Sequence, residues 1–179
     1  MQKNGPFAGV SLLDSLVSLI LIVITLLSLI AGILTSISLQ QQNRELSLAM
    51  NMARTYLSQI EQYNCLYGLV ESFNTYTSNA YQFFDVPGLS PSTGSPEDSS
   101  GTKRVGYVAF PTKPGNTLNE DELASWGREK DLDGNGSVNT SVSPSDLVWL
   151  PLRIIIRWRG KTGNREWILS STLPKRPTG

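Results

Sequence analysis

The sequence predicts an α+β protein in which a long N-terminal helix packs on a small antiparallel β-sheet. Two observations lead to this prediction. Residues 10–39 form an apolar run long enough to cross a bilayer, and an apolar stripe continues the helical period to about residue 60. Near the C-terminus, apolar and charged residues then alternate, as they do in strands with one buried face.

The apolar run predicts a single-pass membrane anchor that stays in the mature protein. About 20 apolar residues in a helix cross the roughly 30 Å hydrocarbon core. Polar helical sequence follows the run directly, whereas a cleaved secretory signal has a shorter apolar core and a small-residue cleavage site. Lys3 and the amino terminus are the only positive charges before the run, so we expect a cytoplasmic N-terminus and an exterior C-terminal part.

The helix is predicted to continue beyond the membrane as an amphipathic rod. Apolar side chains recur every three or four residues from Leu46 to Ile60, with mostly polar side chains between them. Asn64 and Gly68 supply helix-stopping chemistry, so we place the whole helix over residues 10–66. The apolar stripe of its outer half must be covered by the rest of the chain.

Residues 67–179 are predicted to form one small exported sheet domain. Residues 87–101 are rich in Pro, Gly and Ser, which favours an exposed, mobile loop. A strand is predicted from Arg104 to Phe110, and Asn119 with three following acids predicts a capped helix to about Lys130.

The clearest β pattern lies in residues 152–173. Apolar and mostly basic residues alternate up to a Gly-Lys-Thr-Gly turn at residues 160–163, and a second strand follows over residues 165–173. We pair Trp158 with Trp167 and Arg159 with Glu166, because this register satisfies both faces of the hairpin.

Composition argues against an enzyme. The chain has 15 basic and 15 acidic residues, and it has no histidine, which removes the usual general base and the commonest metal ligand. Cys65 is its one cysteine, so no internal disulfide forms; we expect a small buried apolar group, with intermolecular pairing as the alternative.

Gly9, Val10 and Asp14 form the pattern on which a family resemblance depends. A glycine precedes an apolar run whose fifth residue is an acid, and a long helix and a sheet follow. In this respect the chain resembles type IV pilins, minor pilins and type II secretion pseudopilins, and most of all PilV-type minor pilins. It departs from them in having aspartate for glutamate, valine for phenylalanine or methionine, and Pro-Phe-Ala instead of a basic residue before the glycine.

The resemblance implies that residues 1–9 are a leader, which prepilin peptidase removes after Gly9. Val10 would then be the mature N-terminus, with a methylated amine. The implied partners are the membrane, other pilin or pseudopilin subunits, and an inner-membrane assembly platform. The exterior domain would lie in the periplasm or outside the cell, in a pilus or a pseudopilus.

Asp14 has a physical role that does not depend on the resemblance. A carboxylate at the edge of the bilayer is costly unless it is paired, and cleavage after Gly9 would create a free amine on Val10 of a neighbouring subunit. Pairing would neutralise both groups. The alternatives for Asp14 are a hydrated, unpaired carboxylate at the interface, or a helix cap. For the long apolar helix the alternative is a plain signal anchor.

A second pattern predicts a calcium loop. Oxygen-bearing side chains stand at positions 1, 3, 5, 7 and 9 of a loop with glycine at position 6, as in EF-hand and dockerin loops. These residues are Asp131, Asp133, Asn135, Ser137 and Asn139. Position 12 is Val142 rather than an acid, and Asp146 could fold back to replace it. The alternative is a tight turn without a metal.

A third pattern is a basic strand. Arg153, Arg157 and Arg159 share one face of the predicted hairpin and could bind nucleic acid or another polyanion. The alternatives are a solvated face, or a face that meets the acids at residues 120–122 of a neighbour.

Two functional classes remain. The first is a structural subunit, a minor pilin or pseudopilin whose helix packs into a filament. The second is a membrane-anchored exterior binding module that does not polymerise.

Overall fold

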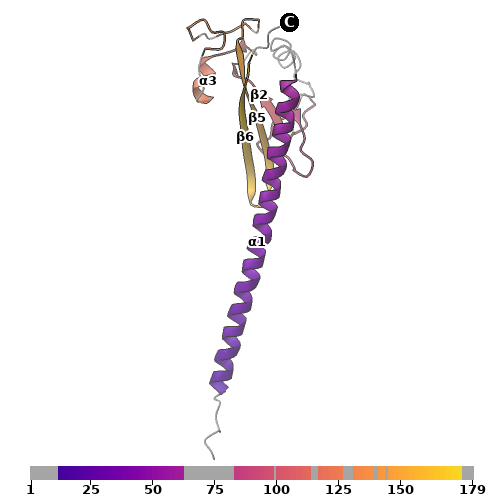
Figure 1. Ribbon diagram of the computed structural model, residues 1–179. Helices are drawn as coiled ribbons and strands as arrows, with labels where there is room; N and C mark the ends of the chain where they lie inside the picture. The colour runs from indigo at the N-terminus through magenta and orange to yellow at the C-terminus, as the bar shows by residue number, and fades with distance from the viewer. Residues whose placement is uncertain are drawn as a thin grey trace, which may run out of the picture. The chain divides into compact units, whose positions relative to one another are not determined.

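A computed structural model of the chain describes residues 12–62, 83–98, 100–113, 117–126, 131–138, 141–143 and 145–174. The predicted α+β class is confirmed, because a long N-terminal helix packs on a four-stranded antiparallel sheet (Figure 1). The helices are α1 (Leu12–Glu61) and α3 (Asp121–Trp126), and the strands are β1 (Phe83–Phe84), β2 (Gly106–Ala109), β3 (Thr112–Lys113), β4 (Thr117–Leu118), β5 (Trp149–Gly160) and β6 (Gly163–Pro174). The predicted helix end at residues 64–68 and Cys65 lie outside the described residues.

The main sheet has the strand order β1-β2-β5-β6, and β3 pairs with β4 in a separate two-stranded sheet. Strands β2, β5 and β6 confirm the three strands that the sequence predicts. A turn of two residues, Lys161 and Thr162, joins β5 to β6, with Gly160 paired to Gly163. Gly163 has a φ of 122°, which glycine adopts without strain.

The predicted register of the β5–β6 hairpin is wrong by two residues. Trp167 lies opposite Ile156 rather than Trp158, and Glu166 lies opposite Arg157 rather than Arg159. The tight two-residue turn fixes the pairing, because the length of a hairpin loop sets its register. A shift of two residues keeps each side chain on its predicted face, so the predicted buried face is still correct.

The chain divides into two compact units, residues 1–43 and residues 44–179, and helix α1 contributes residues to both. In the first unit, nearly every described side chain is exposed. In the second unit, Ala49, Ala53 and Ile60 of α1 are buried, which confirms that the rest of the chain covers the amphipathic stripe. Asn119 Oδ1 accepts a hydrogen bond from the Asp121 backbone N–H at 2.9 Å and so caps α3, as the sequence predicts.

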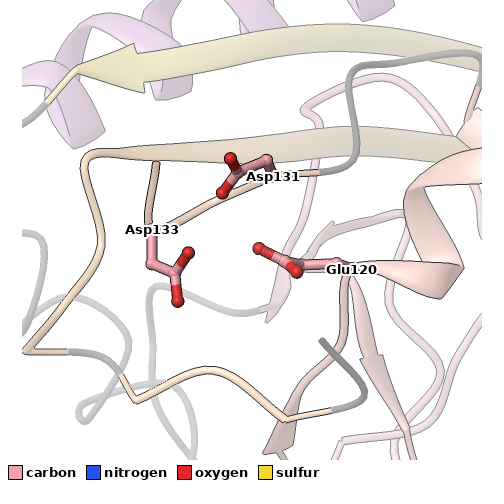
Figure 2. A group of neighbouring side chains, drawn as sticks. All are labelled: Glu120, Asp131 and Asp133. Carbon is pink, nitrogen blue, oxygen red and sulfur yellow. The ribbon is translucent and has the colours of Figure 1, made fainter. Parts of the chain in front are cut away.

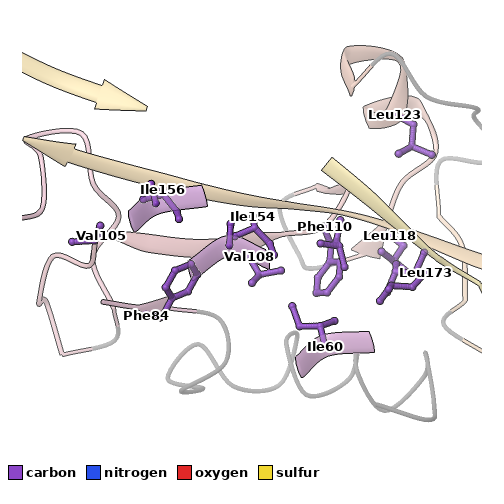
Figure 3. Packing of buried hydrophobic residues seen from close by; sticks show 14 of the residues in the cluster. Ile60, Phe84, Val105, Val108, Phe110, Leu118, Leu123, Ile154, Ile156 and Leu173 are labelled. Carbon is purple, nitrogen blue, oxygen red and sulfur yellow. The ribbon is translucent and has the colours of Figure 1, made fainter. Parts of the chain in front are cut away.

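The core of the second unit lies on the inner face of β5. Leu152, Ile154 and Ile156 are each 0 % exposed, and they belong to one cluster with Ile60 and Phe84 (Figure 3). Full burial of one such apolar side chain contributes about 1.5–3 kcal/mol, so this face dominates the stability of the unit. The small alanines of α1 let the helix backbone come close to the sheet.

One polar contact also joins α1 to β5. The indole Nε1 of Trp158 donates a hydrogen bond to Glu45 Oε2 at 3.1 Å, between residues 113 positions apart. Trp158 is only 1 % exposed, so its N–H needs a partner within the protein.

Part of the Pro/Gly/Ser-rich segment is buried against the sheet, although we expected an exposed loop. Ser92 and Ser95 are buried, and the Ser95 hydroxyl donates to the Arg157 carbonyl at 2.9 Å. The Arg159 N–H donates to the Ser90 carbonyl at 2.9 Å. Composition did not reveal this packing, because the segment satisfies backbone groups of a strand that comes more than 60 residues later.

Farther along the same segment, one carboxylate organises a turn. Asp98 accepts hydrogen bonds from the Ser100 hydroxyl, the Thr102 backbone N–H and the Arg104 guanidinium, and these contacts hold its pKa well below the ordinary value of 3.8. Its contribution to stability is therefore present above about pH 4 and is lost as the pH falls below that value.

Gly106 is required by the ring of Phe84, which stacks on Tyr56 of α1 with a centroid distance of 3.8 Å. A Cβ at residue 106 would lie 2.2 Å from Phe84 Cε2. We therefore expect Gly106→Ala to lower the free energy of unfolding by about 1–3 kcal/mol, because overpacking forces a buried ring to move.

The measurement for Gly106→Ala is thermal melting of the full chain in detergent. Gly94→Ala is the matched control, since a Cβ there would meet nothing within 4 Å. Equal melting temperatures for the two variants would contradict this role for Gly106.

Candidate functional site

The processing residues Gly9 and Val10 lie outside the described residues. Asp14 lies in the first turn of α1, where its side chain is exposed. A negative charge at a helix N-terminus interacts favourably with the helix dipole, by about 0.3–1 kcal/mol. The position of Asp14 is therefore compatible both with the helix-cap alternative and with a carboxylate that is available to another chain.

Within the described residues, α1 is the one helix long and apolar enough to cross a membrane by length and composition. Three hydroxyl groups of its apolar stretch are satisfied inside the helix. Thr25 donates to the Ile22 carbonyl at 2.8 Å, and Ser28 and Thr35 donate to carbonyls four residues earlier at 2.9 Å. These bonds reduce the cost of placing hydroxyls in hydrocarbon, where no water is present to bind them.

The predicted calcium loop is organised around the carboxylate of Asp131. It accepts hydrogen bonds from the backbone N–H groups of Gly134 at 2.7 Å, Asn135 at 3.2 Å and Gly136 at 2.8 Å. The bond from Gly136 is the largest cause of a lowered pKa at Asp131, followed in this direction by the bond from Gly134. Gly134 and Gly136 have φ values of 73° and 82°, which explains why both positions are glycine.

Three carboxylates converge at this loop. One oxygen from each of Glu120, Asp131 and Asp133 lies within 4.8 Å of the others, and Figure 2 shows the three side chains around a common space. Glu120 is 0 % exposed, and its Oε1 accepts a hydrogen bond from the Leu132 backbone N–H. We call Glu120, Asp131 and Asp133 the acidic cluster.

Glu120 is not recognisable as a ligand from the sequence, because acids such as those at residues 120–122 are typical of the first turn of a helix. A carboxylate that precedes the loop by eleven residues belongs to no linear loop pattern, so no sequence signal pointed to it. Asp146, the predicted substitute at position 12, is exposed and is not part of the acidic cluster. Asn139 lies outside the described residues.

Of the remaining predicted ligands, Asn135 is engaged within the loop and Ser137 is exposed. Asn135 Oδ1 accepts from the Ser137 backbone N–H at 2.7 Å, and Asn135 Nδ2 donates to Asp133 Oδ2 at 2.8 Å. Three carboxylates this close repel one another when ionised, and a hard divalent cation offsets that repulsion. Calcium binding therefore stays a prediction, and the acidic cluster, formed by Glu120 and two acids of the loop, is the group best placed for it.

Two of the three arginines of the basic strand contact other side chains of the protein. The Arg153 guanidinium lies 4.3 Å from the centre of the Trp126 ring, and Arg157 forms an ion pair with Glu166. That ion pair is the first cause of a raised pKa at Arg157. Arg159 is exposed. The structure therefore gives two of the three predicted polyanion ligands intramolecular partners.

The chain matches no protein-family model, no curated protein sequence and no solved structure.

We expect calcium to raise the melting temperature of the full chain, because an ion that binds only the folded state stabilises it by mass action, by about 2.7 kcal/mol at 100 times the dissociation constant. Glu120→Gln and Asp133→Asn should each weaken this response. Asp146→Asn is the matched control, because it removes a nearby charge outside the acidic cluster and should keep the response. Identical melting curves in calcium and in chelator would leave the loop as a turn without a metal.

Proposed function

We propose that this chain is a minor pilin or pseudopilin, a structural subunit of a type IV pilus or of a type II secretion-like filament. The observation that carries the proposal is Asp14, the one acid at the start of the uncharged stretch of residues 15–43, five residues after Gly9. The helix that begins here is long and apolar enough to anchor the subunit in a membrane before assembly. The role is structural, and the chain has no histidine to serve as a general base.

The proposed mechanism begins at the membrane. Prepilin peptidase removes residues 1–9, and the new amine of Val10 becomes the only positive charge before the uncharged helix. An assembly platform in the inner membrane then brings subunits together, and Asp14 of one subunit pairs with the amine of its neighbour. Pairing removes two charges from an apolar environment at once, which favours assembled helices over single ones.

The sheet domain supports this role because it covers only the outer half of α1. Residues 44–61 bury their apolar stripe inside their own unit, whereas residues 13–39 carry exposed apolar side chains in the isolated chain. An exposed apolar helix needs lipid or other helices as its environment. A filament core supplies the second environment after the membrane has supplied the first.

The competing proposal is a membrane-anchored exterior binding module that does not polymerise. The acidic cluster favours it, because a cation-dependent domain could recognise a ligand without assembly. The two proposals differ in processing and in incorporation into filaments.

Processing is tested by the intact mass of the mature protein. We expect the mass to correspond to loss of residues 1–9 and to methylation of Val10, and we expect Gly9→Leu to block the cleavage. A protein that still begins with Met1 in cells with assembled filaments would contradict the filament proposal and favour the binding module.

Assembly is tested by Asp14→Ala. We expect the variant to insert and to be processed, but to be at least about tenfold scarcer in sheared filaments, which corresponds to a loss of about 1.4 kcal/mol of pairing. Asp14→Glu is the matched control, since it keeps the charge and should assemble. Normal amounts of the alanine variant in filaments would show that no pairing at Asp14 is needed.

A further inference from the structure

Four basic residues belong to the end of the β5–β6 hairpin and to the part of α1 that lies next to it. Three come from the hairpin, namely Arg159, Lys161 and Arg165, and the fourth is Arg44 of α1; we call these four residues the tip cluster. Arg44, Arg159 and Lys161 are exposed, and Arg165 is half-buried. In the described part of the chain, none of the four forms a salt bridge.

Contacts at Glu45 place the hairpin tip beside the helix. Trp158, two residues before the turn-flanking Gly160, donates its indole N–H to Glu45 Oε2 at 3.1 Å. A Cβ on Gly160 would lie 3.0 Å from that same oxygen and 3.0 Å from Arg165 Cδ. Glu45 thus lies at the hairpin tip, and the four basic residues of the tip cluster outnumber it.

The covalent chain keeps this tip near the end of the apolar helix. Leu39 is the last large exposed apolar residue of α1, and Arg44 follows it by five residues. Five residues span at most about 18 Å, whatever course the chain takes between them. If residues 13–39 cross a bilayer, as the proposed function requires, then the tip cluster is tethered within reach of the bilayer surface.

We propose that the tip cluster binds anionic phospholipid headgroups at the surface of the membrane that anchors the chain. Lys and Arg side chains reach phosphate groups while their stems stay on the protein, and their attraction to an anionic surface acts over about one Debye length. The tether raises the local concentration of headgroups, so the contacts form without any further binding site. The sheet domain is thereby held against the bilayer until assembly removes the subunit from it.

A lipid surface fits the tip cluster better than a nucleic acid does. The tip cluster is a small patch at one end of a hairpin, whereas the outer-face residues Arg153 and Arg157, which would extend it along the strand, are engaged with Trp126 and Glu166. A continuous basic stripe for a long polyanion is therefore not formed. A surface of headgroups needs only a few exposed charges in one plane.

The test measures how close the tip lies to the bilayer in the full chain. The chain is placed in nanodiscs of phosphatidylcholine alone, or of phosphatidylcholine with phosphatidylglycerol. A donor dye is attached at Thr162→Cys in a Cys65→Ser background, and acceptor dyes are carried by the lipids. We expect higher energy transfer in the anionic discs, and loss of this increase when salt is raised from about 0.01 M to about 1 M, which shortens the Debye length from about 30 Å to about 3 Å.

Charge variants identify the residues. Arg44→Gln and Lys161→Gln, alone and together, should remove the increase that anionic lipid causes. Arg54→Gln is the matched control, because it removes the same charge from an exposed position ten residues farther along α1, about 15 Å at helical rise. Equal melting temperatures of the variants establish that the fold is intact.

Two results would overturn the proposal. One is equal transfer in neutral and anionic discs, and the other is an equal loss in Arg44→Gln and Arg54→Gln. Flotation with vesicles of phosphatidylcholine alone separates this failure from failure of the membrane anchor. A chain that floats with neutral vesicles but shows no lipid-dependent transfer refutes the tip cluster alone, whereas a chain that does not float refutes the anchor and the tip cluster with it.

Discussion

The inner face of β5 and the outer half of α1 must cover each other, and the rest of the second unit follows from this constraint. The strand carries large apolar side chains that are completely buried. The buried residues of the helix include alanines, which allow the helix backbone to approach the strand closely. Neither element is stable alone, because an isolated hairpin is at best marginal in water and an amphipathic stripe needs a partner. Strand β2 and the loop before it then complete the hydrogen bonds along the other edge of β5.

The sequence was sufficient to predict the elements that have a clear local periodicity of apolar and polar residues. The long helix, strand β2, the start of α3 and both strands of the hairpin all follow from patterns of apolar and polar residues. The register failed because two registers satisfy nearly the same face pattern, and only the length of the turn distinguishes them. Strands β1, β3 and β4 have two residues each, too few for any periodicity.

The candidate sites show the same limit. The glycines and oxygens of the Asp131 loop follow a linear pattern and were predictable, whereas Glu120 reaches the acidic cluster only through the fold. The arginines of β5 were predicted to share one face, and they do. Their partners Glu166 and Trp126 could not be assigned, because one depends on the register and the other on where α3 lies against the sheet.

The distance in sequence between α1 and β5 governs when this domain can fold. Glu45 meets Trp158 across 113 residues, and β2 meets β5 across about 45, so the contacts that join α1 and β2 to β5 are distant in sequence. Long loops must close before such contacts form, which slows folding. In the order of the sequence the apolar stripe of α1 comes first, and its cover arrives with the last part of the chain. A chain that emerges from its N-terminus therefore passes through a stage in which this apolar stripe is uncovered, and the stage ends when the C-terminal hairpin is complete.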